Sequence, residues 1–244
     1  MPNVFWALLL ERSIQEHNVS AMLDVSGRAG RLGYTRIFHP YSRTDLTRSN
    51  IVKAFLEKAT DPDDVLVMLD NDHLHPYDII ERLARHPHEV GVVGALAFRR
   101  GQPHYPCFFV KDGLGQFSIP TEWEPNALLK GTIVGTGAVA IKRWVFDALE
   151  QAGMAWPHFR YTYVPEGEVQ PSEDIYFGEC CEQVGVAHYC DTSIETPHLT
   201  VATVDSNSWV EWMNDHPQIH EPGFDAARLF TNKVDEPSAE GVQP

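Results

Sequence analysis

Four short strand-like runs alternate with three helical stretches in the first hundred residues, and this order restricts the possible folds more than any other feature. The strand-like runs are Val4 to Leu10, Thr35 to His39, Val65 to Leu69 and Val90 to Leu96. The helical stretches are Ser13 to Ser26, with a break expected at Gly27 to Gly33, then Thr47 to Ala59 and Pro76 to Arg85. Continuous apolar runs are typical of strands buried on both faces. The order therefore predicts an α/β fold with a doubly wound, mainly parallel sheet and helices on both faces.

Beyond residue 100 the chain becomes richer in glycine, proline and aromatic residues, which predicts a smaller antiparallel section. The expected elements are a hairpin from Cys107 to Val110 and Gln116 to Ile119, strands Thr132 to Ile141 and Ala187 to Cys190, and helices Lys142 to Ala152, Ser172 to Val184 and Ser206 to Asp215. We expect one domain over residues 1–230. Residues 231–244 are polar and end in proline, which predicts a disordered tail.

The overall charge is strongly acidic, because 34 Asp and Glu outnumber 19 Lys and Arg and give a formal net charge of −15. This balance argues against a protein that grips nucleic acid through its phosphates, since such proteins carry a basic stripe. No apolar run reaches the roughly 18 residues of a membrane span. The four cysteines lack a zinc-ligand spacing, which predicts reduced thiols in a cytoplasmic protein.

The carboxylates of Asp70 and Asp72 directly follow the buried run Val65 to Leu69. In an open α/β sheet, ligands bind at the carboxyl ends of the strands. Two carboxylates at this spacing can share a hard divalent cation, which can in turn hold a diphosphate. An acidic turn that caps the next helix is the alternative. The strand context favours a cation site made by Asp70 and Asp72, with Asn71 between them.

A second acidic pair, Glu173 and Asp174, follows the expected helix cap Ser172. Acidic residues in a first helical turn complement the helix dipole, so the pair has a purely structural explanation. The same position keeps a carboxylate ionised, and an ionised carboxylate in a pocket can accept a proton from an attacking hydroxyl. The residues alone leave both interpretations open.

His198 lies in the loop after the last expected strand, where it can return to the cation as a third ligand. An imidazole beside two carboxylates suits Mn²⁺. His73 is adjacent to Asp72 and competes with His198 for this role. A histidine in a loop is more often a surface residue without a ligand.

Two further segments are candidates for donor binding. Gly135 and Gly137 flank Thr136 in an expected strand, where glycine usually marks a bulge or the close approach of a ligand or another backbone. Arg48 lies near the expected start of a helix, so the helix N-terminus and its guanidinium can face a phosphate or a base. An exposed arginine without a ligand is the alternative.

Together these segments resemble the GT-A glycosyltransferases, in particular the inverting, family-two-like members of bacteria and phages. The matching segments are LDND (Leu69 to Asp72), GTGAVAIKRWVFDAL (Gly135 to Leu149), SEDIYF (Ser172 to Phe177), TPHL (Thr196 to Leu199) and TRSNIV (Thr47 to Val52). The first four of these motifs, in the family's order, are fairly specific together, and the resemblance covers Val4 to His198.

The resemblance implies a role for each motif. Asp72 would bind the metal directly, with Asp70 towards the donor ribose or the metal, and His198 would complete the site. Asp174 would be the catalytic base, in a motif shared with Glu173. The cofactor would be Mn²⁺ or Mg²⁺, and the donor a nucleotide sugar, most simply a UDP-sugar. Residues 1–100 would form the nucleotide-binding half and residues 101–230 the acceptor-side half.

The implied reaction is transfer of a sugar to an acceptor hydroxyl with inversion, although the same pattern occurs in retaining GT-A enzymes. The acceptor stays open: a glycan, a small molecule or modified phage DNA. One alternative function is a sugar-nucleotide nucleotidyltransferase, but its glycine-rich loop would follow the first strand, whereas Ser26 to Arg36 follows an expected helix. The other is a non-catalytic nucleotide-sugar- or metal-binding module of the same fold.

Overall fold

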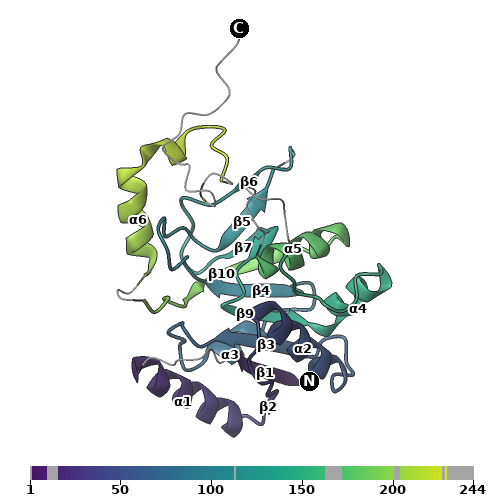
Figure 1. Cartoon of the computed structure of the whole chain (residues 1–244). Helices are drawn as coiled ribbons and strands as arrows, with labels where there is room; N and C mark the ends of the chain where they lie inside the picture. The colour runs from purple at the N-terminus through teal and green to yellow at the C-terminus, as the bar shows by residue number, and fades with distance from the viewer. Residues whose placement is uncertain are drawn as a thin grey trace.

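The computed structural model describes residues 2–9, 16–112, 114–162, 172–200, 204–226 and 229. A seven-stranded sheet with the order β2-β1-β3-β9-β4-β10-β7 forms its centre (Figure 1). The strands that run in one direction are β1 (Val4–Leu9), β2 (Thr35–Arg36), β3 (Val65–Asp70), β4 (Val92–Leu96) and β10 (His188–Glu195). The strands β7 (Leu128–Gly131) and β9 (Ala138–Lys142) run in the opposite direction.

A smaller antiparallel sheet, ordered β6-β5-β8, contains β5 (Phe108–Lys111), β6 (Phe117–Ser118) and β8 (Ile133–Val134). The helices are α1 (Glu16–Arg31), α2 (Thr44–Leu56), α3 (Ile79–Ala84), α4 (Arg143–Gln151), α5 (Glu173–Gln183) and α6 (Ser206–Asp215), followed by the short 3₁₀ helix η1 (Pro217–His220). The expected mixed α/β class, its mainly parallel sheet and its antiparallel section are confirmed. None of the helices in the described part of the chain is both long and apolar enough to cross a membrane.

Helices cover both faces of the central sheet, which explains why its strands read as continuous apolar runs. Alternate residues of a strand point to opposite faces. Phe5 therefore packs with Phe55 of α2 in one buried cluster, whereas its neighbour Trp6 packs with Val25 of α1 in the other. The first cluster also includes side chains of α4 and α5, and the second includes side chains of α3.

The glycines near the end of α1 do not break the helix where expected. The helix continues through Gly27 to Arg31, because burial of Val25 and Ala29 stabilises its last turns and a glycine in a helix costs only about 1 kcal/mol. Gly33, with a φ of +73°, then ends it in the left-handed region that glycine adopts readily.

Other boundaries shift in ways that matter for the site. The helix α2 begins at Thr44 instead of Thr47, and α3 begins at Ile79 instead of Pro76. The strand β10 continues five residues beyond the expected end at Cys190. The single strand expected from Thr132 to Ile141 is two strands, β8 in the small sheet and β9 in the central sheet. The expected tail at 231–244 lies outside the described residues.

Candidate functional site

The parallel strands β3, β4 and β10 end at the same edge of the central sheet, and the segments that follow them pair through their backbones. The N–H of Leu74 donates to the carbonyl of Pro197 at 2.9 Å, and the N–H of Leu199 donates to the carbonyl of Asp72 at 2.7 Å. These bonds form an antiparallel bridge between His73 and His198. Two loops far apart in the sequence are thereby held side by side.

This pairing gathers Asp72, His73 and His198 into one cluster, here called the carboxylate–histidine cluster. A carboxylate oxygen and one ring nitrogen from each histidine all lie within 4.8 Å of one another. Nε2 of His198 is 3.2 Å from Oδ2 of Asp72, and Nε2 of His73 is 3.9 Å from Oδ1. His73 and His198, which compete in the sequence, thus lie together in the structure.

Backbone carbonyls orient both imidazoles for ligand binding. Nδ1 of His73 is 2.9 Å from the carbonyl oxygen of Thr196, and Nδ1 of His198 is 2.8 Å from that of Phe98. A carbonyl only accepts, so each Nδ1 carries the hydrogen, and each Nε2 is left to face Asp72. Two imidazoles and one carboxylate form a donor set that fits a divalent transition metal such as Mn²⁺.

The charges around the cluster support the same assignment. Burial, together with the nearby charge of His198, lowers the pKa of His73 to about 3, which keeps this ring neutral and able to act as a ligand. Burial acts to lower the pKa of His198, but the hydrogen bond to Asp72 outweighs it and raises that pKa. A cation bound here would take the place of the His198 proton beside Asp72.

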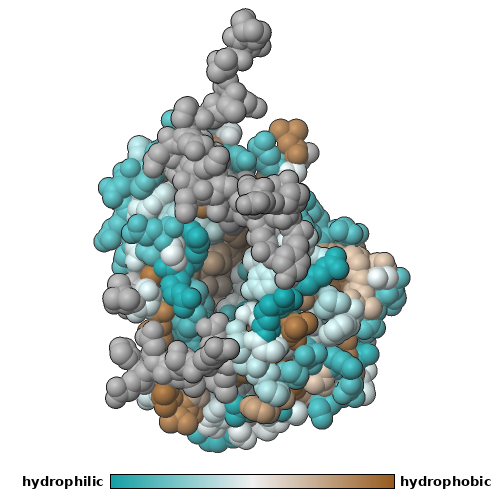
Figure 2. Space-filling model, viewed as in Figure 1, coloured by the Kyte–Doolittle hydropathy of each residue, from teal (hydrophilic) through white to brown (hydrophobic). Residues whose placement is uncertain are grey.

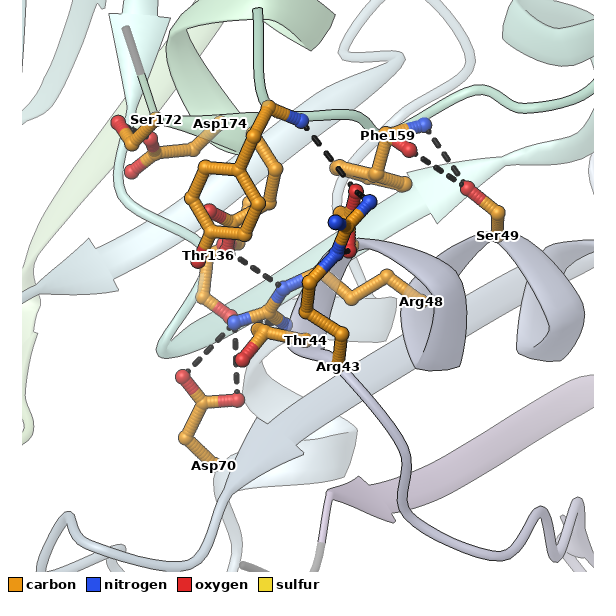
Figure 3. A network of polar contacts seen from close by, with 12 residues as sticks. Arg43, Thr44, Arg48, Ser49, Asp70, Thr136, Phe159, Ser172 and Asp174 are labelled. Carbon is orange, nitrogen blue, oxygen red and sulfur yellow. Dashed lines mark hydrogen bonds and ion pairs between the residues drawn. The ribbon is translucent and has the colours of Figure 1, made fainter. Parts of the chain in front are cut away.

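Asp70 does not share this cluster, in contrast to its expected role as a metal ligand. Nη2 of Arg48 donates to both of its carboxylate oxygens, at 3.0 and 2.8 Å (Figure 3). The donor atoms that converge come instead from Asp72, His73 and His198. The reason is that Asp70 is the last residue of β3 and its side chain meets a buried guanidinium from α2.

Arg48 itself differs from the expected phosphate-facing residue at a helix start. Because α2 begins at Thr44, Arg48 lies in its second turn, points into the protein and is only 2% exposed. Besides Asp70, its Nε donates to Oε1 of Glu173 at 3.2 Å and its Nη1 donates to the carbonyl of Thr136 at 3.1 Å. This Arg48 bridge ties the end of β3 to the first turn of α5.

Asp174 lies beside Glu173 at the start of α5, with a different environment. Its Oδ1 accepts hydrogen bonds from the Ser172 hydroxyl and, at 2.9 Å, from the N–H of Ile175. The Ser172 side chain therefore binds Asp174 and does not cap the helix backbone. Burial and the charge of Glu173 raise the pKa of Asp174 to about 6. Such a carboxylate is ionised near neutral pH and is a stronger base than an ordinary aspartate.

The two glycines around Thr136 are explained by contacts within the protein. A Cβ at Gly137 would lie 2.5 Å from Nε2 of His73, and a Cβ at Gly135 would lie 2.6 Å from Cβ of Cys107. The expected close approach is therefore that of neighbouring side chains. The N–H of Asp70 also donates to the carbonyl of Gly137 at 2.8 Å. The Gly135–Gly137 turn thus positions Asp70, His73 and, through Thr136, Arg48.

A small pocket adjoins Asp72 at the same sheet edge. It is lined by Leu9, Tyr41, Thr44 and the segment Asp70 to Asp72. The sequence analysis does not identify Tyr41, in the polar loop before α2, or Thr44, the first residue of that helix. The face of the molecule seen in Figures 1 and 2 is hollowed close to β10, with apolar residues at the base of the hollow.

Comparison with known proteins gives only distant similarities. No protein-family model and no curated protein matches the chain. Among solved structures, A197 from STIV is 15% identical with a TM-score of 0.49, over 85% of this chain and 92% of that one. GalNAc-T7, solved with UDP, GalNAc and Mn²⁺, is 12% identical with a TM-score of 0.45, over 96% of this chain and 54% of that one.

Drosophila β-1,4-galactosyltransferase 7, solved with manganese, UDP-Gal and xylobiose, is 13% identical with a TM-score of 0.43. That similarity covers 93% of this chain and 79% of the other. Two of these three proteins carry names of the enzyme class that the motifs resemble.

Proposed function

We propose that this protein is a metal-dependent glycosyltransferase, which moves a sugar from a nucleoside-diphosphate donor to an acceptor hydroxyl with inversion. Two observations carry the proposal together: a cluster of metal-ligand type and a carboxylate of raised pKa. Asp72, His73 and His198 supply the first, and Asp174 supplies the second. The Arg48 bridge joins Asp70 to Glu173, which lie close in sequence to Asp72 and Asp174, and so connects the segments that carry the two parts.

The carboxylate–histidine cluster would hold the cation, with Mn²⁺ as the ion that best suits two imidazoles and a carboxylate. When bound, the cation supplies charge stabilisation to the departing diphosphate. Leu9, Tyr41 and Thr44, which line a small pocket beside Asp72, would border the bound nucleotide. UDP is the proposed nucleotide, because the resemblance of the motifs to the GT-A glycosyltransferases implies a UDP-sugar donor.

Asp174 would act as the base. Its Oδ1 is already bound by Ser172 and Ile175, which leaves Oδ2 to accept the acceptor's proton. Once deprotonated, the acceptor oxygen would attack the anomeric carbon from the side opposite the diphosphate, which inverts the configuration. The acceptor hydroxyl and the anomeric carbon would gain rate mainly from being held in this geometry.

The nucleotidyltransferase alternative fits the structure less well. It requires a glycine-rich phosphate loop directly after β1, whereas Gly27 and Gly30 lie inside α1. The non-catalytic alternative differs from the proposal only in turnover. Measured transfer or donor hydrolysis therefore separates the two.

The test is nucleotide binding and turnover in the wild type and in two kinds of variant. UDP at about a hundredfold its Kd should add roughly 2.7 kcal/mol to the free energy of unfolding in the presence of Mn²⁺. Asp72→Ala and His198→Ala should lose this effect. Asp174→Asn should keep it, while transfer falls by about 10²- to 10⁴-fold. Normal turnover in Asp174→Asn would exclude Asp174 as the base, and no stabilisation by any nucleoside diphosphate would exclude the donor site.

A further inference from the structure

Arg100 contacts the carboxylate–histidine cluster from outside. Its Nη1 donates to Oδ2 of Asp72 at 3.2 Å, the same oxygen that lies 3.2 Å from Nε2 of His198. A cation held by Asp72, His73 and His198 would have to compete for that oxygen. The positive charge of Arg100 therefore lies beside the same Asp72 oxygen that a bound metal ion would need.

The ion pair between Arg100 and Asp72 is weak enough for another interaction to replace it. The Arg100 side chain is 53% exposed, against 24% for Asp72, and exposed ion pairs contribute little to stability. The neighbouring Arg99 differs, because its guanidinium donates to the carbonyl of Gln102 at 2.8 Å and lies over the ring of Tyr105. The Arg99 side chain thus interacts within its own loop, whereas that of Arg100 contacts the cluster.

The backbone that carries Arg100 is anchored on both sides. The N–H of Arg99 donates to the carbonyl of Tyr105 at 3.0 Å, and the N–H of Cys107 donates to that of Ala97 at 2.8 Å. The base of the loop is therefore fixed beside the cluster. Rotation of the Arg100 side chain alone can move its charge from Asp72 to a ligand next to it.

The charges of the ligands favour movement of the Arg100 side chain from Asp72 to the phosphates. A divalent cation on the cluster would repel the guanidinium from Asp72, and a nucleoside diphosphate carries more negative charge than one divalent cation neutralises. Arg48, which also lies near this edge, is 2% exposed and held by Asp70 and Glu173, so it cannot serve the diphosphate. Arg100 can, and arginine suits bidentate contact with phosphate oxygens.

We propose that Arg100 is an exchangeable counter-ion: it neutralises Asp72 in the metal-free protein and moves to the diphosphate when metal and a nucleoside diphosphate bind. The phosphate half of this inference rests on the proposed glycosyltransferase function. The metal half rests on the contact with Asp72 alone. Loss of Arg100 should therefore have opposite effects on the two ligands.

The experiment is titration calorimetry of the wild type, Arg100→Ala and the matched control Arg99→Ala, first with Mn²⁺ alone. Arg100→Ala should bind Mn²⁺ about two- to fivefold more tightly than the wild type, because the competing ion pair is gone. Arg99→Ala should bind it like the wild type. Equal or weaker Mn²⁺ binding by Arg100→Ala would overturn the exchange.

The second titration adds UDP, GDP, ADP and CDP in turn to the Mn²⁺-loaded proteins, with the matching monophosphates as the comparison. Arg100→Ala should lose about tenfold in affinity for the preferred diphosphate and less for its monophosphate. If the wild type binds a diphosphate and Arg100→Ala binds it equally well, the phosphate role is wrong while the proposed function stands. If the wild type binds no nucleoside diphosphate, the proposed function and the phosphate role of Arg100 are both wrong. The Mn²⁺ titration then tests only whether Arg100 competes with the metal for Asp72.

Discussion

Replacement of Arg48 by methionine should destabilise the protein more than any exposed charge substitution. Methionine keeps most of the length of the side chain but removes the hydrogen bonds to Asp70, Glu173 and Thr136. Arg48 is 2% exposed and Glu173 is buried, so the change leaves carboxylates with little access to water and no counter-ion. Removing one partner of a buried ion pair costs about 3–5 kcal/mol, out of roughly 5–15 kcal/mol for a whole domain.

The measurement is equilibrium unfolding in urea at pH 8, followed by circular dichroism, with the free energy of unfolding taken from linear extrapolation. The control is Lys53→Met, which removes a positive charge from an exposed position of the same helix and should change the free energy by less than about 0.5 kcal/mol. Arg48→Lys keeps the charge but not the planar fork, so it should fall between the two. A loss below about 1 kcal/mol in Arg48→Met would refute the buried bridge.

Arg48 also affects the chemistry at Asp174. Its positive charge lowers the pKa of Asp174 against the effects of burial and Glu173. Without it, that pKa should rise further above about 6, and the acid limb of the pH–rate profile should move to higher pH. If a folded Arg48 variant kept the wild-type pH–rate profile, Arg48 would stabilise the structure without affecting the pKa of Asp174.

Three further predictions concern other parts of the site and core. Gly137→Ala should push the His73 ring away from the cluster, because the added Cβ would lie 2.5 Å from Nε2, and should weaken Mn²⁺ binding measured by calorimetry; unchanged affinity would show that His73 is not a ligand. Transfer by the wild type should fall as the pH drops through about 6, where Asp174 gains a proton, and a flat profile from pH 7 to 5 would contradict its role as the base. The buried His158 has no hydrogen-bond partner for either ring nitrogen among the described residues, and burial lowers its pKa to about 4. Because this folded-state pKa is below the unfolded value of about 6.5, stability is lost as the pH falls from about 6.5 towards 4, and His158→Leu should reduce the drop in Tm between pH 7 and 5; an equal drop would contradict this.

The order of elements was predictable because it rests on local patterns. A strand buried on both faces must be apolar at every position, so β1, β3 and β4 are visible as short continuous runs. The boundaries were less predictable. The last turns of α1 remain helical despite two glycines because contacts with other elements bury them. The division between β8 and β9 depends on the pairing of each strand with a different sheet.

The sequence by itself determined the α/β architecture and pointed to Asp72, His198 and Asp174, because Asp72 and His198 follow strands and Asp174 begins a helix. Only the tertiary structure decided which donor atoms converge. His73 joins the cluster and Asp70 leaves it, because the loops around residues 72 and 198, which are 126 positions apart, pair through their backbones. Likewise, Arg48 forms a buried bridge and is not the expected phosphate ligand, because it meets Glu173 at a separation of 125 residues. Side-chain direction and charge pairing over such separations depend on packing, which no local pattern contains.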